Sequence, residues 1–321
     1  KIKTLTNNFC KDVIYLKWRI TYICNYHCPY CIQVRQGNKK EYEGKLLEEE
    51  TVRILSLADK IDPFLSKVNP KNKDVVLEII GGEVTLIDLK SLMEKIKDKN
   101  IKRLNITTNG SMPIDYFYSL VNYLHNRGIK LSITMSFHDT QTTFSEYMYK
   151  AEKLNALVDE FSCEYVSRRD NQETVEQFIS VLEGKGIDYK IEPNKNTDHL
   201  SARLKGELIV TSNFTNRGLA RYNVVFEDEE GNEIEKSYDC LAEMMNDKDN
   251  ASSALCKVIL SEGMYCTESY SYFYLLYDGS ILGGTKENPR CDTRTPIDDF
   301  VPLEKPLQCQ ISSCTCCGCN K

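Results

Sequence analysis

Short runs of β-branched and other apolar residues alternate with longer segments whose apolar positions recur at helical spacing. The short runs predict strands over residues 13–20, 74–80, 102–107, 130–136, 161–167 and 187–191. The longer segments predict helices over residues 46–61, 87–96, 114–127, 143–158 and 173–182. Gly128 and Gly184 follow two of these helices, and a glycine in that place indicates a helix end. Beyond residue 193 the alternation stops, and residues 222–238 predict a hairpin with an acidic tip.

Strands that alternate with helices predict parallel βαβ units joined by right-handed crossovers. The predicted fold is therefore α/β, a partial (β/α)6 TIM-like barrel with a small cysteine-rich C-terminal extension. We expect a barrel core over residues 1–195, a connecting region with the acidic hairpin over 196–255, and a cysteine-rich region over 256–321. In barrels of this kind the chemistry lies at the carboxyl ends of the strands, so residues that directly follow the strands are candidates for the site.

Composition narrows the class of protein. The chain of 321 residues has a formal net charge of −6, which argues against non-specific binding of nucleic acid, because phosphates attract basic surfaces. No apolar run approaches the length that spans a bilayer, and no signal peptide is visible. The chain contains 14 cysteines. In a long chain without an export signal, this number favours metal or redox chemistry in the cytoplasm over disulfides.

Three cysteines directly after the first predicted strand form the main candidate site. Cys24, Cys28 and Cys31 have the spacing Cys-x3-Cys-x2-Cys. Three thiolates can hold three irons of a [4Fe-4S] cluster, which leaves the fourth iron free for a ligand other than protein. A structural zinc ion needs four closed ligands, so a zinc site here would require Cys10 as the fourth.

This spacing, with Tyr30 just before the last cysteine, resembles the signature of the radical S-adenosylmethionine (SAM) enzymes. The resemblance implies that the free iron binds the methionine part of SAM. It also implies that an electron from the cluster cleaves SAM to methionine and a 5'-deoxyadenosyl radical. The SAM contacts expected from the resemblance are Tyr30, Gly81, Gly82, Glu83, Asn109, Ser136, Ser167 and Arg168.

Several of these expected contacts have a physical reason as well as an ordinary alternative. Glycines such as Gly81 and Gly82 have no side chain to block a ligand, and the guanidinium of Arg168 suits a carboxylate. The resemblance assigns Glu83 to the amino group of SAM and Ser136 to its ribose, and His138 and Asp139 share the segment of Ser136. The alternatives are a strand-to-helix turn at the glycines, solvated loop residues elsewhere, and a left-handed turn residue at Asn109.

A second group of cysteines lies near the C-terminus and loosely resembles the SPASM or twitch extension of radical SAM enzymes, which carries auxiliary [4Fe-4S] clusters. Gly284 stands where that pattern has a cysteine, and the last cysteines are closely spaced, so we expect one auxiliary cluster rather than two. A zinc site of four cysteines is the alternative. The expected ligands come from Cys266, Cys291, Cys309, Cys314, Cys317 and Cys319.

Three functional hypotheses follow. In the family an auxiliary-cluster region accompanies peptide and protein substrates, so the first hypothesis is a radical SAM enzyme that crosslinks, epimerises or oxidises a ribosomally synthesised peptide or a protein side chain. Its electron donor would be a flavodoxin- or ferredoxin-like protein, and we expect no nucleic-acid or membrane partner. The second hypothesis is a radical SAM dehydrogenase, or another modifier, of a small molecule such as a sugar or cyclitol. The third is a non-catalytic iron-sulfur or zinc protein, which leaves Gly81, Gly82 and Glu83 unexplained.

Overall fold

The chain divides into two compact units. The computed structural model describes residues 2–9, 13–194, 208–209, 211–213, 220–227, 230–238, 265–266, 270–283, 293–305 and 307–308. One unit consists of Lys17–Ser66 and Val75–Asn213, and it contains every residue of the predicted cysteine loop. The other consists of Lys1–Leu16, Lys67–Asp74 and Phe214–Lys321. Within the described ranges, no helix has both the length and the apolar character needed to cross a bilayer.

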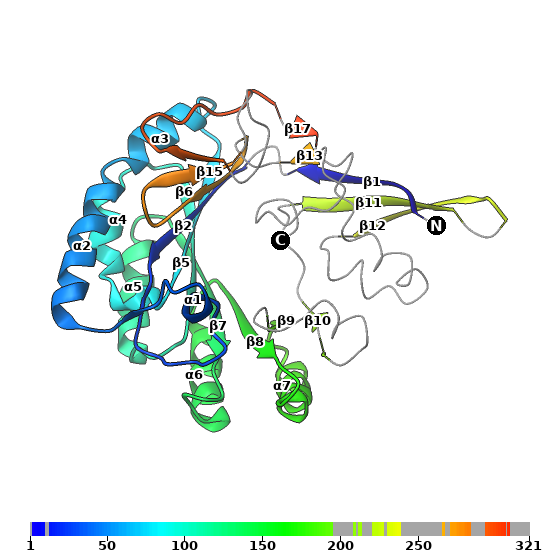
Figure 1. The fold of residues 1–321 in the computed structure, drawn as a ribbon, viewed down its shortest axis with the longest axis horizontal. Helices are drawn as coiled ribbons and strands as arrows, with labels where there is room; N and C mark the ends of the chain where they lie inside the picture. Colours follow the sequence, from blue (N-terminus) through cyan, green and yellow to red (C-terminus); the bar gives the residue numbers. More distant parts are fainter. Residues whose placement is uncertain are drawn as a thin grey trace. The chain divides into compact units, whose positions relative to one another are not determined.

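The unit that holds the cysteine loop is built on a sheet with helices along one side (Figure 1). Its strand order is β10-β9-β8-β7-β6-β5-β2. Strands β5 to β9 are parallel, and β10 is antiparallel to β9. The strands are β2 (Val13–Thr21), β5 (Asp74–Gly81), β6 (Ile101–Thr108), β7 (Lys130–Phe137), β8 (Glu160–Ser167), β9 (Tyr189–Pro193) and β10 (Thr211–Ser212).

The helices of this unit follow the strands in the alternation that the sequence predicts. The α/β fold with a parallel sheet is therefore confirmed. A short helix, α1, and a 3-10 turn, η1, come in addition to the predicted helices. The helices are α1 (Ile32–Arg35), α2 (Gly44–Ala58), α3 (Ile61–Val68), η1 (Val84–Leu86), α4 (Leu89–Lys95), α5 (Ile114–His125), α6 (Phe144–Leu157) and α7 (Gln172–Lys185).

One expected helix end is wrong. Gly184 lies inside α7, and the helix ends at Gly186, whose φ of 63° places it in the left-handed region. Glycine adopts this conformation without the strain that a Cβ brings. The predicted helix over residues 46–61 is formed by α2, which ends at Ala58, and a further helix, α3, begins at Ile61.

The two faces of the sheet differ in polarity, as expected when helices cover only one of them. In β6, Leu104 and Ile106 are buried, while Asn105 and Thr107 on the opposite face are half-buried. At the carboxyl ends of β7 and β8, an aromatic cluster of Phe137, Phe144, Tyr147, Tyr165 and Phe178 fills the space between strands and helices. This packing fixes the strand ends from which the candidate site residues project.

The strand pairs described within the other unit are antiparallel. The predicted hairpin is confirmed as β11 (Ala220–Glu227) paired with β12 (Glu233–Tyr238). A strand that the sequence analysis did not predict, β1 (Ile2–Phe9), adds to β11. The start of β2 adjoins β14 (Tyr272–Leu275), since Tyr15 N–H donates to the carbonyl of Ser271 at 2.7 Å. The remaining strands are β15 (Ser280–Leu282), β16 (Arg294–Pro296), β13 (Tyr265–Cys266) and β17 (Leu307–Gln308).

Candidate functional site

The three cysteines lie on one loop at the end of β2. Cys24 closes the short strand β3 (Ile23–Cys24), which pairs with β4 (Lys40–Glu41). Cys31 precedes α1, and its N–H donates to the carbonyl of Cys28 at 3.2 Å. All three thiols are free of disulfides; Cys28 is buried, and the other two are half-buried. The loop therefore presents three thiols from a short, internally hydrogen-bonded turn.

The end of β5 packs directly against this loop. Gly82 N–H donates to the carbonyl of Thr21 at 2.9 Å, and Glu83 N–H donates to the carbonyl of Ile23 at 2.8 Å. A Cβ added at Gly81 would lie 2.4 Å from the carbonyl oxygen of Thr21, and one at Gly82 would lie 2.0 Å from that of Ile23. Both glycines are thus required by contact between two backbone segments of the protein itself.

Glu83 points into the protein. Its side chain is fully buried, and its carboxylate accepts four hydrogen bonds, from the N–H and Oγ1 of Thr85, from Oγ1 of Thr108 and from the N–H of Asn109. Burial raises the pKa of this carboxyl above its usual value, although the hydrogen bonds act in the opposite direction. Glu83 therefore ties the end of β5 to the end of β6, a role that its expected contact with SAM does not require.

Asn109 links the end of β6 to the cysteine loop. Its Nδ2 donates to Oδ1 of Asn25 at 3.0 Å and lies 4.0 Å from Sγ of Cys24. Its Oδ1 accepts from the N–H of Ser111 at 2.9 Å. Asn109 does not have a positive φ. The residue in the left-handed region at this turn is Gly110, whose φ is 69°. The alternative of a left-handed turn residue at Asn109 is therefore wrong.

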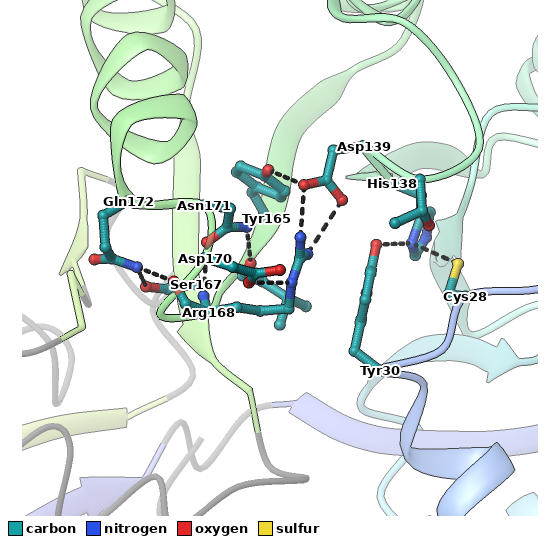
Figure 2. Close-up of polar contacts among 12 residues, drawn as sticks. Cys28, Tyr30, His138, Asp139, Tyr165, Ser167, Arg168, Asp170, Asn171 and Gln172 are labelled. Atoms are coloured by element: carbon teal, nitrogen blue, oxygen red, sulfur yellow. Dashed lines mark hydrogen bonds and ion pairs between the residues drawn. The ribbon is translucent and has the colours of Figure 1, made fainter.

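The ends of β7 and β8 meet the loop through His138, Asp139 and Arg168 (Figure 2). Asp139 binds Arg168 with both oxygens, at 3.1 and 2.8 Å, and accepts from the hydroxyl of Tyr165 at 2.7 Å. Nε of Arg168 donates to Asp170 at 3.0 Å. Burial alone would raise the pKa of Asp139, but the hydrogen bonds from Arg168 and Tyr165 lower it below its usual value.

The Tyr30 ring stands between Arg168 and His138 (Figure 2). The guanidinium carbon of Arg168 lies 4.4 Å from the ring centroid, a distance typical of cation–π contacts. On the other side, Nδ1 of His138 lies 3.2 Å from the Tyr30 hydroxyl and 3.3 Å from Sγ of Cys28. Burial lowers the pKa of His138 to about 4, so the imidazole is neutral at pH 7.

Burial also raises the pKa of two of the cysteine thiols. It raises the pKa of Cys24 to about 11. Burial likewise raises the pKa of Cys28, against hydrogen bonds from Tyr30 and Thr140. Without a bound cation, both groups are protonated at neutral pH. They become ligands only when a metal displaces their protons.

The other expected contacts differ in their surroundings. Ser136 is half-buried and pairs in register with Glu164 on the face of the sheet opposite Phe137. Ser167 is fully buried, and its Oγ accepts from Nε2 of Gln172 at 3.0 Å. The structure thus brings the cysteine loop together with Gly81, Gly82, Asn109 and Arg168, whereas Ser136 and Ser167 lie on the strands themselves.

Sequence reasoning missed contacts that join the cysteine loop to the segment after β7. The backbone N–H of His27 donates to Oε1 of Gln141 at 3.1 Å, and the Tyr26 ring meets the His138 ring edge-on at 5.7 Å. The only available signal was position, because both partners follow the fourth predicted strand.

The residues present fit a [4Fe-4S] cluster with one open iron. In the described part of the chain, no three His, Cys, Asp or Glu side chains converge in a way that would hold a single metal ion. A cube places each thiolate on a different iron, so its sulfurs stand further apart than the ligands of one ion. Three free thiols on one loop match that donor set, and His138, whose Nδ1 lies 3.3 Å from Sγ of Cys28, contacts a ligand sulfur.

The expected auxiliary ligands cannot be placed in the same way. Cys266 is the last residue of β13. Cys291, Cys309, Cys314, Cys317 and Cys319 lie outside the described residues.

No family model matches the chain, but curated enzymes match part of it. An S-adenosylmethionine-dependent nucleotide dehydratase of Psychrobacter lutiphocae is 29% identical over 121 residues, which are 36% of this chain and 39% of that protein. A GTP 3',8-cyclase of Photorhabdus laumondii subsp. laumondii is 31% identical over 111 residues, which are 34% of this chain and 30% of that protein. The chain therefore spans less than two fifths of the length of these relatives.

The fold also has a counterpart among solved structures. A structure of native anSMEcpe with bound AdoMet superposes with a TM-score of 0.50 and 16% sequence identity, covering 90% of this chain and 79% of that chain. At this identity the likeness is one of fold. The partial sequence matches are to curated enzymes, one of which is named as S-adenosylmethionine-dependent.

Proposed function

We propose that this chain is a radical SAM enzyme whose [4Fe-4S] cluster is held by Cys24, Cys28 and Cys31. The observation that carries the proposal is the position of three free thiols beside Gly81, Gly82 and the ends of β6 to β8. When bound, the cluster supplies the electron that cleaves SAM to methionine and a 5'-deoxyadenosyl radical, which takes a hydrogen atom from the substrate. A flavodoxin- or ferredoxin-like protein would reduce the cluster, and the cytoplasm is the proposed compartment.

The chain's own residues divide into two groups. Those proposed to contact SAM are the backbone at Gly81, Gly82 and Tyr30, together with Asn109 and Ser136. Glu83, Ser167 and Arg168 are assigned to positioning, because their polar atoms are already engaged by protein partners. Arg168 in particular faces the carboxylates of Asp139 and Asp170, so a third carboxylate, that of SAM, would meet a site that is already neutralised.

For the substrate we propose a peptide or protein side chain, which the enzyme would crosslink, epimerise or oxidise. The support is the resemblance of the C-terminal cysteines to an auxiliary-cluster region, and a second [4Fe-4S] cluster there is part of the proposal. A small molecule is the second candidate. It is favoured by the names of the sequence relatives, one a nucleotide dehydratase and the other a GTP cyclase, so a nucleotide is the small molecule to test first.

The first test is SAM cleavage by anaerobically reconstituted protein. Wild type is compared with the C24A/C28A/C31A variant for iron, sulfide and 5'-deoxyadenosine formed under dithionite. C163A is the matched control, because Cys163 is a buried thiol within β8. We expect wild type and C163A to form 5'-deoxyadenosine and the triple variant to form none. Wild type that loads iron but cleaves no SAM would leave the non-catalytic iron-sulfur or zinc protein as the function.

Iron in the triple variant tests the second cluster. About one cluster's worth of iron in an inactive triple variant would support an auxiliary cluster. Complete loss of iron would remove that support and weaken the peptide hypothesis. The substrate itself is tested by measuring which compounds accelerate SAM cleavage, with nucleoside triphosphates in one series and short peptides encoded beside the gene in the other.

A further inference from the structure

The sulfur of Cys28 has more hydrogen-bonding side chains around it than the sulfur of Cys24. Nδ1 of His138 lies 3.3 Å from Sγ, and Tyr30 and Thr140 also form hydrogen bonds with this sulfur. Cys24 receives a backbone N–H from Tyr26 at 3.4 Å and the more distant Nδ2 of Asn109 at 4.0 Å. Cys28 is also buried, with 5% of its surface exposed, so its hydrogen bonds are poorly screened by solvent.

The direction of the contact between Cys28 and His138 follows from chemistry. A cysteine bound to iron is a thiolate and has no proton to donate. A hydrogen bond to such a thiolate at 3.3 Å has its proton on Nδ1 of His138, which also lies 3.2 Å from the Tyr30 hydroxyl, whose oxygen can share this proton. Both the neutral tautomer with that proton and the charged imidazole satisfy this condition.

The surroundings of His138 hold its ring in this orientation. Tyr26 meets the ring edge-on, and Tyr30 is nearly parallel to it, with centroids 6.2 Å apart. The next residue, Asp139, is bound by Arg168 and Tyr165, and the preceding Phe137 is buried in the aromatic cluster. The imidazole is thus fixed by the ends of two strands, and groups that hydrogen-bond to metal ligands are commonly held rigidly in this way.

We propose that His138 raises the reduction potential of the cluster by donating its Nδ1 proton to the Cys28 thiolate. The inference rests on the proposed function, since it needs a cluster on this loop. Reduction adds one electron, from the external donor protein, and so adds negative charge that is shared with the ligand sulfurs. A hydrogen bond to such a sulfur stabilises the reduced state more than the oxidised state, which makes the potential less negative. His138 is a positioning residue in this role, acting through Cys28.

The test is a redox titration of the reconstituted full chain without SAM, followed by electron paramagnetic resonance. Asparagine carries its amide nitrogen at the δ position, like Nδ1 of histidine, whereas glutamine carries it one bond further out. H138N should therefore keep the donor and H138Q should lose it, although both are polar amides. H125Q is the matched control, because His125 binds Asp159 at 2.8 Å on the surface. The C24A/C28A/C31A variant identifies signals from any other cluster.

We expect H138Q to have a more negative midpoint potential than wild type, H138N to lie closer to wild type, and H125Q to equal it. Equal potentials in wild type and H138Q at full iron loading would overturn the inference, and so would equal shifts in H138Q and H138N. Loss of iron from H138Q alone would assign the contact to cluster retention and would also overturn it. Wild type that loads no cluster at all would instead refute the proposed function, a result that iron and sulfide analysis shows before any titration.

Discussion

Gly81 and Gly82 let the end of β5 approach the cysteine loop more closely than any other residue type would permit. The atoms that a Cβ would meet belong to the backbone of Thr21, Tyr22 and Ile23, which cannot move aside as a flexible side chain would. The glycines therefore set the position of Cys24 directly, and this is a reason for the Gly-Gly pair that is independent of any ligand.

The first prediction concerns Gly82. G82A should lower the free energy of unfolding by roughly 1–3 kcal/mol and reduce the iron bound per chain, because the loop backbone must shift. Unfolding in urea can be followed by the fluorescence of Trp18, which is the single tryptophan and is fully buried. G184A is the control, since nothing lies within 4 Å of its added Cβ, and alanine should stabilise α7 by about 0.5–1 kcal/mol. A G82A protein that unfolds and loads iron like wild type would contradict the packing argument.

The second prediction concerns Glu83. An amide nitrogen in E83Q would face hydrogen-bond donors, and each buried group left unsatisfied costs about 1–3 kcal/mol. We expect cluster-free E83Q to be less stable than wild type by about 2 kcal/mol with no SAM present. E94Q, at an exposed position of α4, should change stability by less than about 0.5 kcal/mol. Wild-type stability in E83Q combined with loss of SAM binding would instead make Glu83 a direct ligand.

At the scale of elements, the periodic segments could be predicted from sequence because their pattern is local. The fourth strand, expected over residues 130–136, is Lys130–Phe137, and the hairpin is formed as expected. β1 could not be predicted in this way. Its partner, β11, begins at Ala220, far along the chain, and the local pattern of residues 2–9 does not indicate which strand they pair with.

The site shows the same limit. The spacing of the cysteines and the strand ends predicted which segments lie at the loop. The direction of the Glu83 and Arg168 side chains depends on Thr108 and Asp139, which lie on other strands or their ends. A motif in one segment carries no information about such partners, so these contacts could not be predicted from the sequence.

The pairing of Asp139 with Arg168 joins the ends of β7 and β8 and leads to a prediction about pH. Because the pKa of Asp139 is lowered in the folded protein, its ionised form contributes stability above the unfolded value of about 3.9. That contribution is lost as pH falls through the lower folded value. The stability difference between wild type and D139N should therefore shrink below about pH 4.

Urea unfolding of cluster-free protein between pH 7 and pH 3 measures this difference. D170N is the control, because the Asp170 side chain is 76% exposed and exposed ion pairs contribute little. A difference between wild type and D139N that stays constant down to pH 3 would show that Asp139 does not act through its charge.

At the scale of the whole molecule, binding of SAM should increase the free energy of unfolding. SAM at 100 times its Kd should raise the free energy of unfolding of cluster-loaded protein by about 2.7 kcal/mol, because the proposed contacts come from β5, β6 and β7 and are lost on unfolding. The measurement is the urea midpoint under anaerobic conditions, with and without SAM. The C24A/C28A/C31A variant should show no shift, and an equal shift in that variant would place SAM away from the cysteine loop.

The contact between Cys28 and His138 joins residues 110 positions apart. At about 5–20 residues per second, a ribosome needs roughly 6–22 s to make that length of chain. Throughout this interval the nascent chain already carries the three thiols, while the segments that surround them in the folded protein are still being synthesised. Iron and sulfide delivered at that stage would meet a loop without its neighbours, and oxidants would meet unprotected thiols. For the proposed cluster, this timing favours delivery to the completed fold and makes the oxygen level during translation a variable to control in recombinant production.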